Sequence, residues 1–173
     1  GEIYIKNIRS AANTDTYTFS GDPNGETFVP SFTSHGFRYV EITGNGCELS
    51  DISCVTSLEG LVLCNTPDTT GSFSCSDPLV NQLQSNIQWG QRGNSLLVYT
   101  DCPQRNERMG WTGDAQVFAP TAAFNMDVQS FMNKWLLDVR DGQLMYNRQG
   151  AVPDTAPLGG DNRPAGCAGW ADA

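Results

Sequence analysis

The amino-acid sequence predicts a multi-domain β plus α protein, a partial β-sandwich followed by the beginning of a helical domain. Residues 1–72 hold short segments rich in Ile, Val, Thr, Tyr and Phe, separated by Gly, Asn, Asp and Pro, a pattern typical of strands and turns. In residues 73–173 the apolar positions recur with the period of an α-helix instead. We therefore expect one module to end, and the other to begin, near residue 72.

The β part is predicted from short segments that carry β-branched and aromatic residues between turn signals. A series of this kind is typical of a sandwich or a part of one. Their alternation of apolar and polar residues is imperfect, which leaves the ends of each strand loosely defined. The predicted strands are residues 2–8, 15–21, 26–32, 36–44, 53–58 and 60–66.

The first helix is predicted over residues 76–94. A Ser or Asp precedes Pro78, and proline is favoured in the first turn of a helix, where its missing N–H costs no hydrogen bond. Leu79, Leu83 and Ile87 then follow at the spacing that puts apolar side chains on one face of a helix.

Two further helices are predicted after a long loop. Residues 114–127 are rich in Ala, although Pro120 should kink this helix. The helix over 127–142 has the strongest pattern, with Asp127 as its N-cap and Gly142 as its stop. Its apolar positions are Val128, Phe131, Met132, Trp135, Leu136 and Val139.

Three helices that each carry one broad apolar face make a poor domain by themselves, because each face needs a partner to cover it. We therefore expect this chain to be a piece of a larger protein, holding the opening of a larger helical assembly.

Composition excludes several classes of function. Asp and Glu total 19 against 10 Lys and Arg, a net charge of −9, which disfavours a nucleic-acid partner but is compatible with a neutral sugar. The sequence has no apolar run long enough to span a membrane. It has no P-loop or dinucleotide fingerprint, so no cofactor is expected. The oligomeric state and the compartment, secreted or cytoplasmic, stay open.

The six cysteines contain no CxxC pair, so no metal site is expected from them. Cys47, Cys54 and Cys64 are close enough in sequence for one disulfide, and small buried thiols are the equal alternative. His35 is the single histidine, and we expect a packed or surface imidazole there rather than a general base.

The stretch TDCPQRNERMGWTGDAQ, residues 100–116, concentrates the chemistry of the chain. It holds Asp101, Glu107 and Asp114 with almost no aliphatic residue. Because a proline and two glycines interrupt it, we expect a folded loop, not one continuous helix, to bring the acids together.

Three interpretations of this loop compete. The first is a solvated acidic loop whose arginines are surface partners. The second is a calcium site, although the alternating ligand spacing of a calcium loop is missing. The third is acid/base chemistry on a neutral substrate, which Trp111 and Trp170 favour because aromatic faces stack on sugars while carboxylates bind hydroxyls.

The stretch TDCPQRNERMGWTGDAQVFAPTAAFNMDV resembles the active-site signature of the α-L-rhamnosidases of glycoside hydrolase family 78. The resemblance covers the whole chain: GEIYIKNIRSAANTDTYTFSGD and SFTSHGFRYVEITG are similar to the β-sandwich module of that family, and GAVPDTAP and GWADA to later loops of its catalytic domain. It implies an (α/α)6 barrel that removes terminal, non-reducing α-L-rhamnose from rhamnosides with inversion.

The resemblance also implies roles for single residues. Glu107 matches the general acid, Asp101 and Asp114 match acids that bind rhamnose hydroxyls, and Trp111 and Trp170 match aromatic residues that line the pocket. A further candidate for substrate contact is Asp172. The family's general base is a Glu far downstream of Ala173, so we expect it to be absent from this chain, and the chain alone to be inactive.

Two residues depart from the family pattern. Asn106 stands where the family usually has Asp, which removes one negative charge beside the general acid, and Pro120 interrupts a helix. The effect of both departures on activity stays open. The rival functions are another (α/α)6 glycosidase and a non-catalytic carbohydrate-binding protein. Binding alone would need neither Glu107 nor a downstream Glu.

Overall fold

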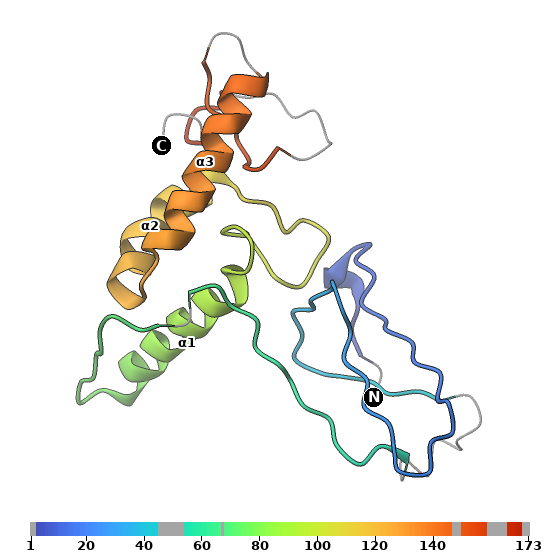
Figure 1. Cartoon of the computed structure of the whole chain (residues 1–173). Helices are drawn as coiled ribbons and strands as arrows, with labels where there is room; N and C mark the ends of the chain where they lie inside the picture. The colour runs from blue at the N-terminus through green and yellow to red at the C-terminus, as the bar shows by residue number, and fades with distance from the viewer. Residues whose placement is uncertain (1–2, 45–53, 67, 147–149, 159–165, 171–173) are drawn as a thin grey trace. The chain divides into compact units, whose positions relative to one another are not determined.

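The structure, a computed structural model, describes residues 3–44, 54–66, 68–146, 150–158 and 166–170 (Figure 1). The chain divides into two compact units. The N-terminal unit comprises Gly1–Glu59 and Gln104–Asn106, and the helical unit comprises Gly60–Pro103 and Glu107–Ala173. Each is described by itself below. In the part of the chain that the structure describes, no helix combines the length and the apolar character that crossing a bilayer requires.

The described residues of the N-terminal unit do not form the predicted strands. A short 3-10 helix, η1, lies at Lys6–Ile8, inside the first predicted strand. A strand requires a neighbouring strand to bond its backbone. The described backbone hydrogen bonds of this unit instead close turns, such as Ala11 N–H to the Ile8 carbonyl at 3.1 Å. A partial sandwich is therefore not confirmed by these residues.

One carboxylate organises much of this unit. Glu26 accepts hydrogen bonds from the Tyr17 hydroxyl at 2.5 Å and from the backbone N–H groups of Ser20 and Gly21, each at 2.9 Å. The hydrogen bond from Tyr17, followed by those from the Ser20 and Asp22 backbone, lowers the pKa of Glu26 to about 2. The loop between Tyr17 and Glu26 is thus closed by hydrogen bonds to an ionised side chain.

His35 belongs to the same unit. Its Nε2 lies 2.9 Å from Oδ2 of Asp15, at a side chain that is 18% exposed. The imidazole is therefore partly buried and contacts a carboxylate of its own unit.

The described residues of the helical unit form three α-helices. The first, α1 at Pro78–Asn94, begins as predicted: the Asp77 carboxylate accepts a hydrogen bond from the Leu79 N–H at 2.8 Å, and Pro78 occupies the first turn. The second, α2 at Thr112–Asn125, begins two residues earlier than predicted and runs through Pro120 without ending there.

The third helix, α3 at Gln129–Tyr146, is longer than predicted. The Asp127 carboxylate accepts a hydrogen bond from the Gln129 N–H at 3.2 Å, so its capping role is confirmed. Gly142 does not stop the helix. A Cβ there would lie 3.0 Å from Cγ of Pro153, so this glycine lets a following loop pack on the helix side.

The core lies between α2 and α3, which run side by side (Figure 1). Met126, in the short connection between the two helices, is fully buried. The glutamines of α1 add polar contacts to α2: Gln91 Nε2 donates to the Ala122 carbonyl at 3.1 Å, and Gln84 Nε2 to the Asn125 side chain at 2.8 Å. The buried apolar cluster consists of Val98, Tyr99, Ala115, Ala122, Met126, Val128, Phe131, Trp135 and Ala156.

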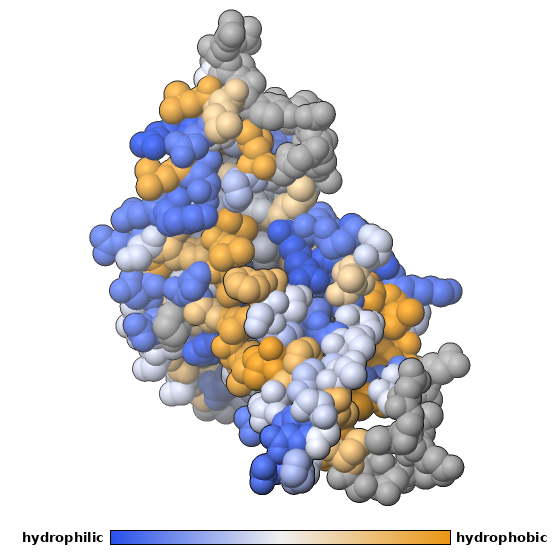
Figure 2. Space-filling model, turned by 45° about the vertical axis from the view of Figure 1, so that its right-hand side comes forward, coloured by the Kyte–Doolittle hydropathy of each residue, from blue (hydrophilic) through white to orange (hydrophobic). Residues whose placement is uncertain are grey.

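Each helix also leaves large apolar side chains exposed. Among those of α1, α2 and α3 are Leu79, Phe124 and Leu144, each more than 70% exposed. Figure 2 shows such apolar side chains reaching the surface between polar ones. An apolar groove runs between α1 and the end of α2, lined by Phe73, Val80, Leu83, Gln84, Ile87 and Phe124.

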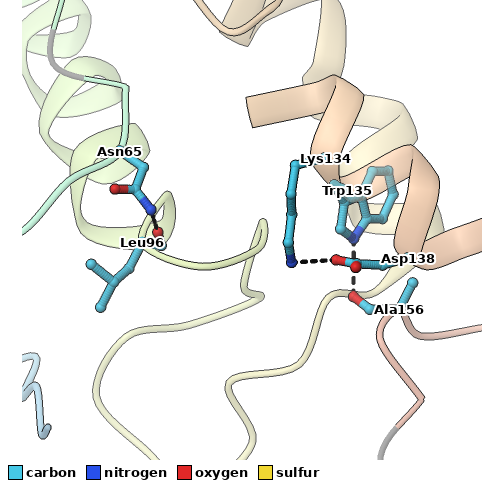
Figure 3. A network of polar contacts seen from close by, with 6 residues as sticks. All are labelled: Asn65, Leu96, Lys134, Trp135, Asp138 and Ala156. Atoms are coloured by element: carbon cyan, nitrogen blue, oxygen red, sulfur yellow. Dashed lines mark hydrogen bonds and ion pairs between the residues drawn. The ribbon is translucent and has the colours of Figure 1, made fainter. Parts of the chain in front are cut away.

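The segment before α1 is fastened to the turn after it. The Asn65 backbone N–H donates to the Ser95 carbonyl at 2.8 Å, and its side-chain amide donates to the Leu96 carbonyl (Figure 3). The segment that leads to α1 is thereby bonded to the turn that follows the C-terminal end of this helix.

Candidate functional site

The acidic loop is anchored by the backbone of Met109. The Asp101 N–H donates to the Met109 carbonyl at 3.3 Å, and the Met109 N–H donates to Oδ1 of Asp101 at 3.1 Å. The Trp111 N–H donates to the same carbonyl at 3.0 Å. One residue thus connects the acid at the start of the loop to the tryptophan at its end.

Two of the predicted acids meet at the base of this loop. One carboxylate oxygen of Asp101, one of Glu107 and the sulfur of Cys102 all lie within 4.8 Å of one another. Asp101 and Glu107 are partly buried, and Cys102 is buried with 7% exposure. The Cys102 thiol donates a hydrogen bond to Oδ2 of Asp101 at 2.9 Å. Both oxygens of Asp101 therefore accept a hydrogen bond from the protein.

These three side chains are also a group of donors that could surround one cation. The arrangement suits a proton better than a metal, since a thiol that donates to a carboxylate is protonated and metals bind the thiolate. Calcium and magnesium prefer oxygen ligands, and one of the three donors here is a sulfur atom. Carboxylate chemistry is the better interpretation of the cluster.

The aromatic residues meet at the first turn of α2. The rings of Trp111 and Trp170 lie edge to face, with centroids 6.1 Å apart and planes at 61°. A Cβ on Gly113 would lie 3.0 Å from Cδ1 of Trp170, so the indole packs directly on this turn. Asp114 is the next residue and is exposed. It lies three residues after Trp111, the N-cap of α2, and so on the same face of the first turn.

The loop at residues 153–156 fixes the backbone that leads into α2. The Ala156 N–H donates to the Gly110 carbonyl at 2.9 Å, and Trp111 forms a β-bridge with Thr155. The indole N–H of the buried Trp135 donates to the Ala156 carbonyl at 3.0 Å (Figure 3). A Cβ on Gly110 would lie 2.1 Å from that carbonyl oxygen, so only glycine allows the two segments this close.

Thr112 and Asp154 hold the turn that carries Trp170. The Thr112 hydroxyl lies 3.0 Å from the backbone carbonyl of Asp154 and 3.0 Å from that of Trp170. The buried Asp154 carboxylate accepts a hydrogen bond from the Cys167 N–H at 3.1 Å. A side-chain hydrogen bond to Asp154 raises the pKa of the Cys167 thiol. The Trp170 N–H in turn donates to the Cys167 carbonyl at 3.1 Å, which completes the turn.

The structure thus brings the predicted residues into two neighbouring groups of the helical unit. Asp101 and Glu107 form one, and Trp111, Asp114 and Trp170 form the other, with Met109 between them. Asp172 lies outside the described residues.

The departure at Asn106 also has a structural account. Asn106 belongs to the N-terminal unit, where its side-chain amide donates to the Ser10 hydroxyl at 2.6 Å. An aspartate lacks the N–H that makes this bond. Among the cysteines, Cys64, Cys75 and Cys167 are free thiols, and Cys47 lies outside the described residues, so its pairing with Cys54 stays untested.

Sequence reasoning overlooked three supporting residues. Cys102 was not among the predicted site residues, although its place next to Asp101 was a usable signal. Asp154 was not predicted either, because its bond to the Cys167 N–H joins segments whose packing a sequence does not specify. Nothing in the sequence singles out Thr112, whose three carbonyl neighbours come from other parts of the chain.

Comparison with known proteins gives matches over both units. A family model described as the six-hairpin glycosidase domain of bacterial α-L-rhamnosidases matches residues 68–173. A second model, described as the concanavalin-like domain of bacterial α-L-rhamnosidases, matches residues 1–63.

Individual relatives agree with these models. An α-L-rhamnosidase of Streptomyces avermitilis is 51% identical over 173 residues, 100% of this chain and 16% of the relative. One from Formosa agariphila is 46% identical over 157 residues, 91% of this chain and 16% of the relative. The crystal structure of the Streptomyces avermitilis α-L-rhamnosidase complexed with L-rhamnose matches 99% of this chain and 16% of that chain, with a TM-score of 0.86 and 51% sequence identity. The chain thus spans about one sixth of the length of these relatives.

Proposed function

The chain belongs to the bacterial α-L-rhamnosidase family with a six-hairpin glycosidase domain, and from that premise we propose that the whole protein is an inverting α-L-rhamnosidase. Its substrates would be rhamnose-containing glycosides or polysaccharides, from which it releases the terminal, non-reducing α-L-rhamnose. The relatives carry the name of this activity, and one of them is known in complex with L-rhamnose.

The observation that carries the proposal is the meeting of Glu107 with Asp101. Breaking a glycosidic bond requires an acid that protonates the leaving oxygen, and a carboxyl group in a partly buried cluster is suited to that task. Glu107 is the proposed acid, since Asp101 already accepts a hydrogen bond at each of its oxygens. Asp101 is the proposed ligand of a rhamnose hydroxyl.

The spacing of this pair bears on the stereochemistry. Carboxyl groups about 5 Å apart are typical of retaining glycosidases, and inverting ones separate the pair by about 6.5–9.5 Å to admit a water. Asp101 and Glu107 lie within 4.8 Å, too close to flank a water. The hydrogen bonds to both Asp101 oxygens weaken it as a nucleophile, which favours inversion with a base elsewhere in the whole protein. The anomer of the released rhamnose distinguishes the two mechanisms.

The second group of residues would hold the sugar ring. Trp111 and Trp170 would line the pocket, with their faces suited to the sugar ring and its methyl group. Asp114 would bind hydroxyls from the first turn of α2. For Asp172 the proposal rests on sequence resemblance alone.

We also propose the architecture that surrounds this site. The exposed apolar faces of α1, α2 and α3 support packing against further helices of an (α/α)6 barrel. The match of residues 1–63 to a concanavalin-like domain supports a partial β-sandwich in front of that barrel. The boundary between the two modules is proposed near residue 72.

Replacing Glu107 by Gln in the whole protein tests the assignment. We expect turnover of an aryl α-L-rhamnoside to fall by a factor of about 100 to 10,000, since the leaving oxygen loses its proton donor. L-Rhamnose binding, measured by calorimetry, should persist. A dinitrophenyl rhamnoside, whose leaving group needs little protonation, should lose far less. The exposed Glu59→Gln variant is the matched control.

Near-normal turnover of the Glu107→Gln variant on an unactivated substrate would contradict the role of general acid. Rhamnose binding without hydrolysis by the unmodified protein would instead favour a carbohydrate-binding protein. Hydrolysis of a different terminal sugar would leave the fold standing and change the substrate.

A further inference from the structure

The thiol of Cys102 has an unusual place for a buried cysteine. Such residues mostly behave as small apolar side chains with a weak S–H donor. Here the sulfur lies 2.9 Å from Oδ2 of Asp101 and within 4.8 Å of a carboxylate oxygen of Glu107. A buried hydrogen-bond donor therefore lies close to both acids of the proposed site.

We propose that Cys102 is a positioning residue, which fixes the Asp101 carboxylate for binding a rhamnose hydroxyl. This inference rests on the proposed function. Asp101 is held at both ends: Oδ1 accepts from the Met109 N–H at 3.1 Å, and Oδ2 accepts from the Cys102 thiol. The amide holds one oxygen of the carboxylate. The thiol supplies the second point that sets the plane of the group.

This arrangement keeps capacity for substrate. A carboxylate oxygen has about two lone-pair sites, so accepting the hydrogen bond from Cys102 does not by itself prevent an oxygen from accepting a sugar hydroxyl. The thiol and the amide hold the Asp101 carboxylate at its two oxygens, so the geometry of binding does not depend on the sugar being present.

The test compares Cys102→Ala, which removes the donor, with Cys102→Ser, which keeps an O–H donor at nearly the same place. In the whole protein, acting on an aryl α-L-rhamnoside, Cys102→Ala should raise KM about tenfold and change kcat much less, because it loses a hydrogen bond to a charged group. Cys102→Ser should stay within about threefold of the unmodified protein. Cys64→Ala is the matched control, since Cys64 is a partly buried thiol whose described partner is Thr66.

A double-mutant cycle separates positioning from general support of the fold. If Cys102 acts through Asp101, adding Cys102→Ala to Asp101→Asn should lower kcat/KM no further than Asp101→Asn does alone. A structural role predicts the same loss in both backgrounds, with Cys102→Ser no better than Cys102→Ala.

The outcomes are distinct. If the unmodified protein hydrolyses rhamnosides and Cys102→Ala matches it in KM, the inference is wrong while the proposed function stands. Additive losses in the cycle would overturn the inference as well. If the unmodified protein has no activity on any rhamnoside, the proposed function fails, and the inference that rests on it fails with it.

Discussion

Different kinds of contact stabilise the N-terminal unit and the helical unit internally. In the N-terminal unit, the Glu26 carboxylate closes a loop of residues that are near neighbours in sequence, and its side chain is only partly buried. In the helical unit, hydrogen bonds join residues far apart in sequence, such as Trp135 with Ala156 and Thr112 with Trp170, around buried apolar side chains. None of the buried core residues comes from the described part of the N-terminal unit.

This difference explains where the candidate site lies. A site needs side chains whose positions are fixed by several independent contacts. In the helical unit such contacts come from Met109, Thr112 and the loop at residues 153–156, next to the predicted acids and tryptophans. If the comparison is correct, steric changes in the core should damage the helical unit strongly, and the N-terminal unit should respond mainly to charge.

The largest expected effect comes from Gly110→Ala. The new Cβ would lie 2.1 Å from the Ala156 carbonyl oxygen, so the loop at 153–156 must move and its hydrogen bonds to Trp135 and Gly110 must weaken. We expect the free energy of unfolding to fall by about 3 kcal/mol or more, a cost typical of an overpacked site combined with lost buried hydrogen bonds. Thermal and urea-induced unfolding, followed by tryptophan fluorescence and circular dichroism, measures it.

Gly90→Ala is the matched control, because a Cβ on this α1 glycine would meet nothing within 4 Å. It should stabilise the helix by up to about 1 kcal/mol, the advantage of Ala over Gly inside a helix. Equal effects of the two substitutions would show that the close approach at Gly110 contributes nothing to stability.

A smaller effect of opposite sign is expected from Tyr99→Phe. Tyr99 packs edge to face on Phe131, and its buried hydroxyl has no hydrogen-bond partner among the described residues. Removing an unsatisfied buried hydroxyl should raise the free energy of unfolding by about 1 kcal/mol. The exposed Tyr4→Phe is the control, and a loss of stability in Tyr99→Phe alone would reveal a partner for the hydroxyl.

The same residue predicts a dependence on pH. Burial, and then the charge of Cys64, raises the pKa of Tyr99 to about 12, from 10.0. Because the unfolded chain releases this proton first, the stabilisation is complete below pH 10 and is lost as the pH rises towards about 12. In the Tyr99→Phe variant, the free energy of unfolding should therefore fall less between pH 10 and about 12 than in the unmodified protein.

The sequence predicted the helices because their signals are local. The Asp77 cap, Pro78 and the apolar spacing of α3 each depend on residues within a few positions of one another. The prediction that Gly142 ends the helix was wrong for the same reason, because it rested on a local signal alone. A glycine near the end of an apolar pattern resembles a helix stop, and only the packing of Pro153 on it shows that the helix continues.

The candidate site was predicted in part. The acids and tryptophans were named from an unusual composition and from a family resemblance. Their supports were not, since Cys102, Thr112 and Asp154 act through contacts between distant segments. The predicted strands show what local patterns cannot predict. A pattern such as that of residues 15–21 indicates a preference for strand, but a strand forms only with a pairing partner.

The smallest effect is expected in the N-terminal unit, and it concerns charge. The pKa of Glu26 is lowered from 4.5 to about 2, first by the Tyr17 hydrogen bond and then by backbone N–H groups of Ser20 and Asp22. A lowered pKa in the folded state means that the stabilisation is complete above pH 4.5 and is lost as the pH falls towards about 2. In an NMR titration the Gly21 amide, which donates to Glu26 at 2.9 Å, should move with a midpoint near pH 2.

Tyr17→Phe should shift that midpoint upward towards 4.5, since it removes the largest cause of the lowered pKa and keeps the ring stacked on Phe28 at 4.8 Å. The exposed Tyr39→Phe should leave the midpoint unchanged. The resonances of the helical core should not follow this titration if the two units are held by separate kinds of contact. A Gly21 midpoint near 4.5 in the unmodified chain would show that the Glu26 loop does not form in solution. The contrast between an N-terminal unit closed by hydrogen bonds to Glu26 and a helical unit with a packed core would then be wrong.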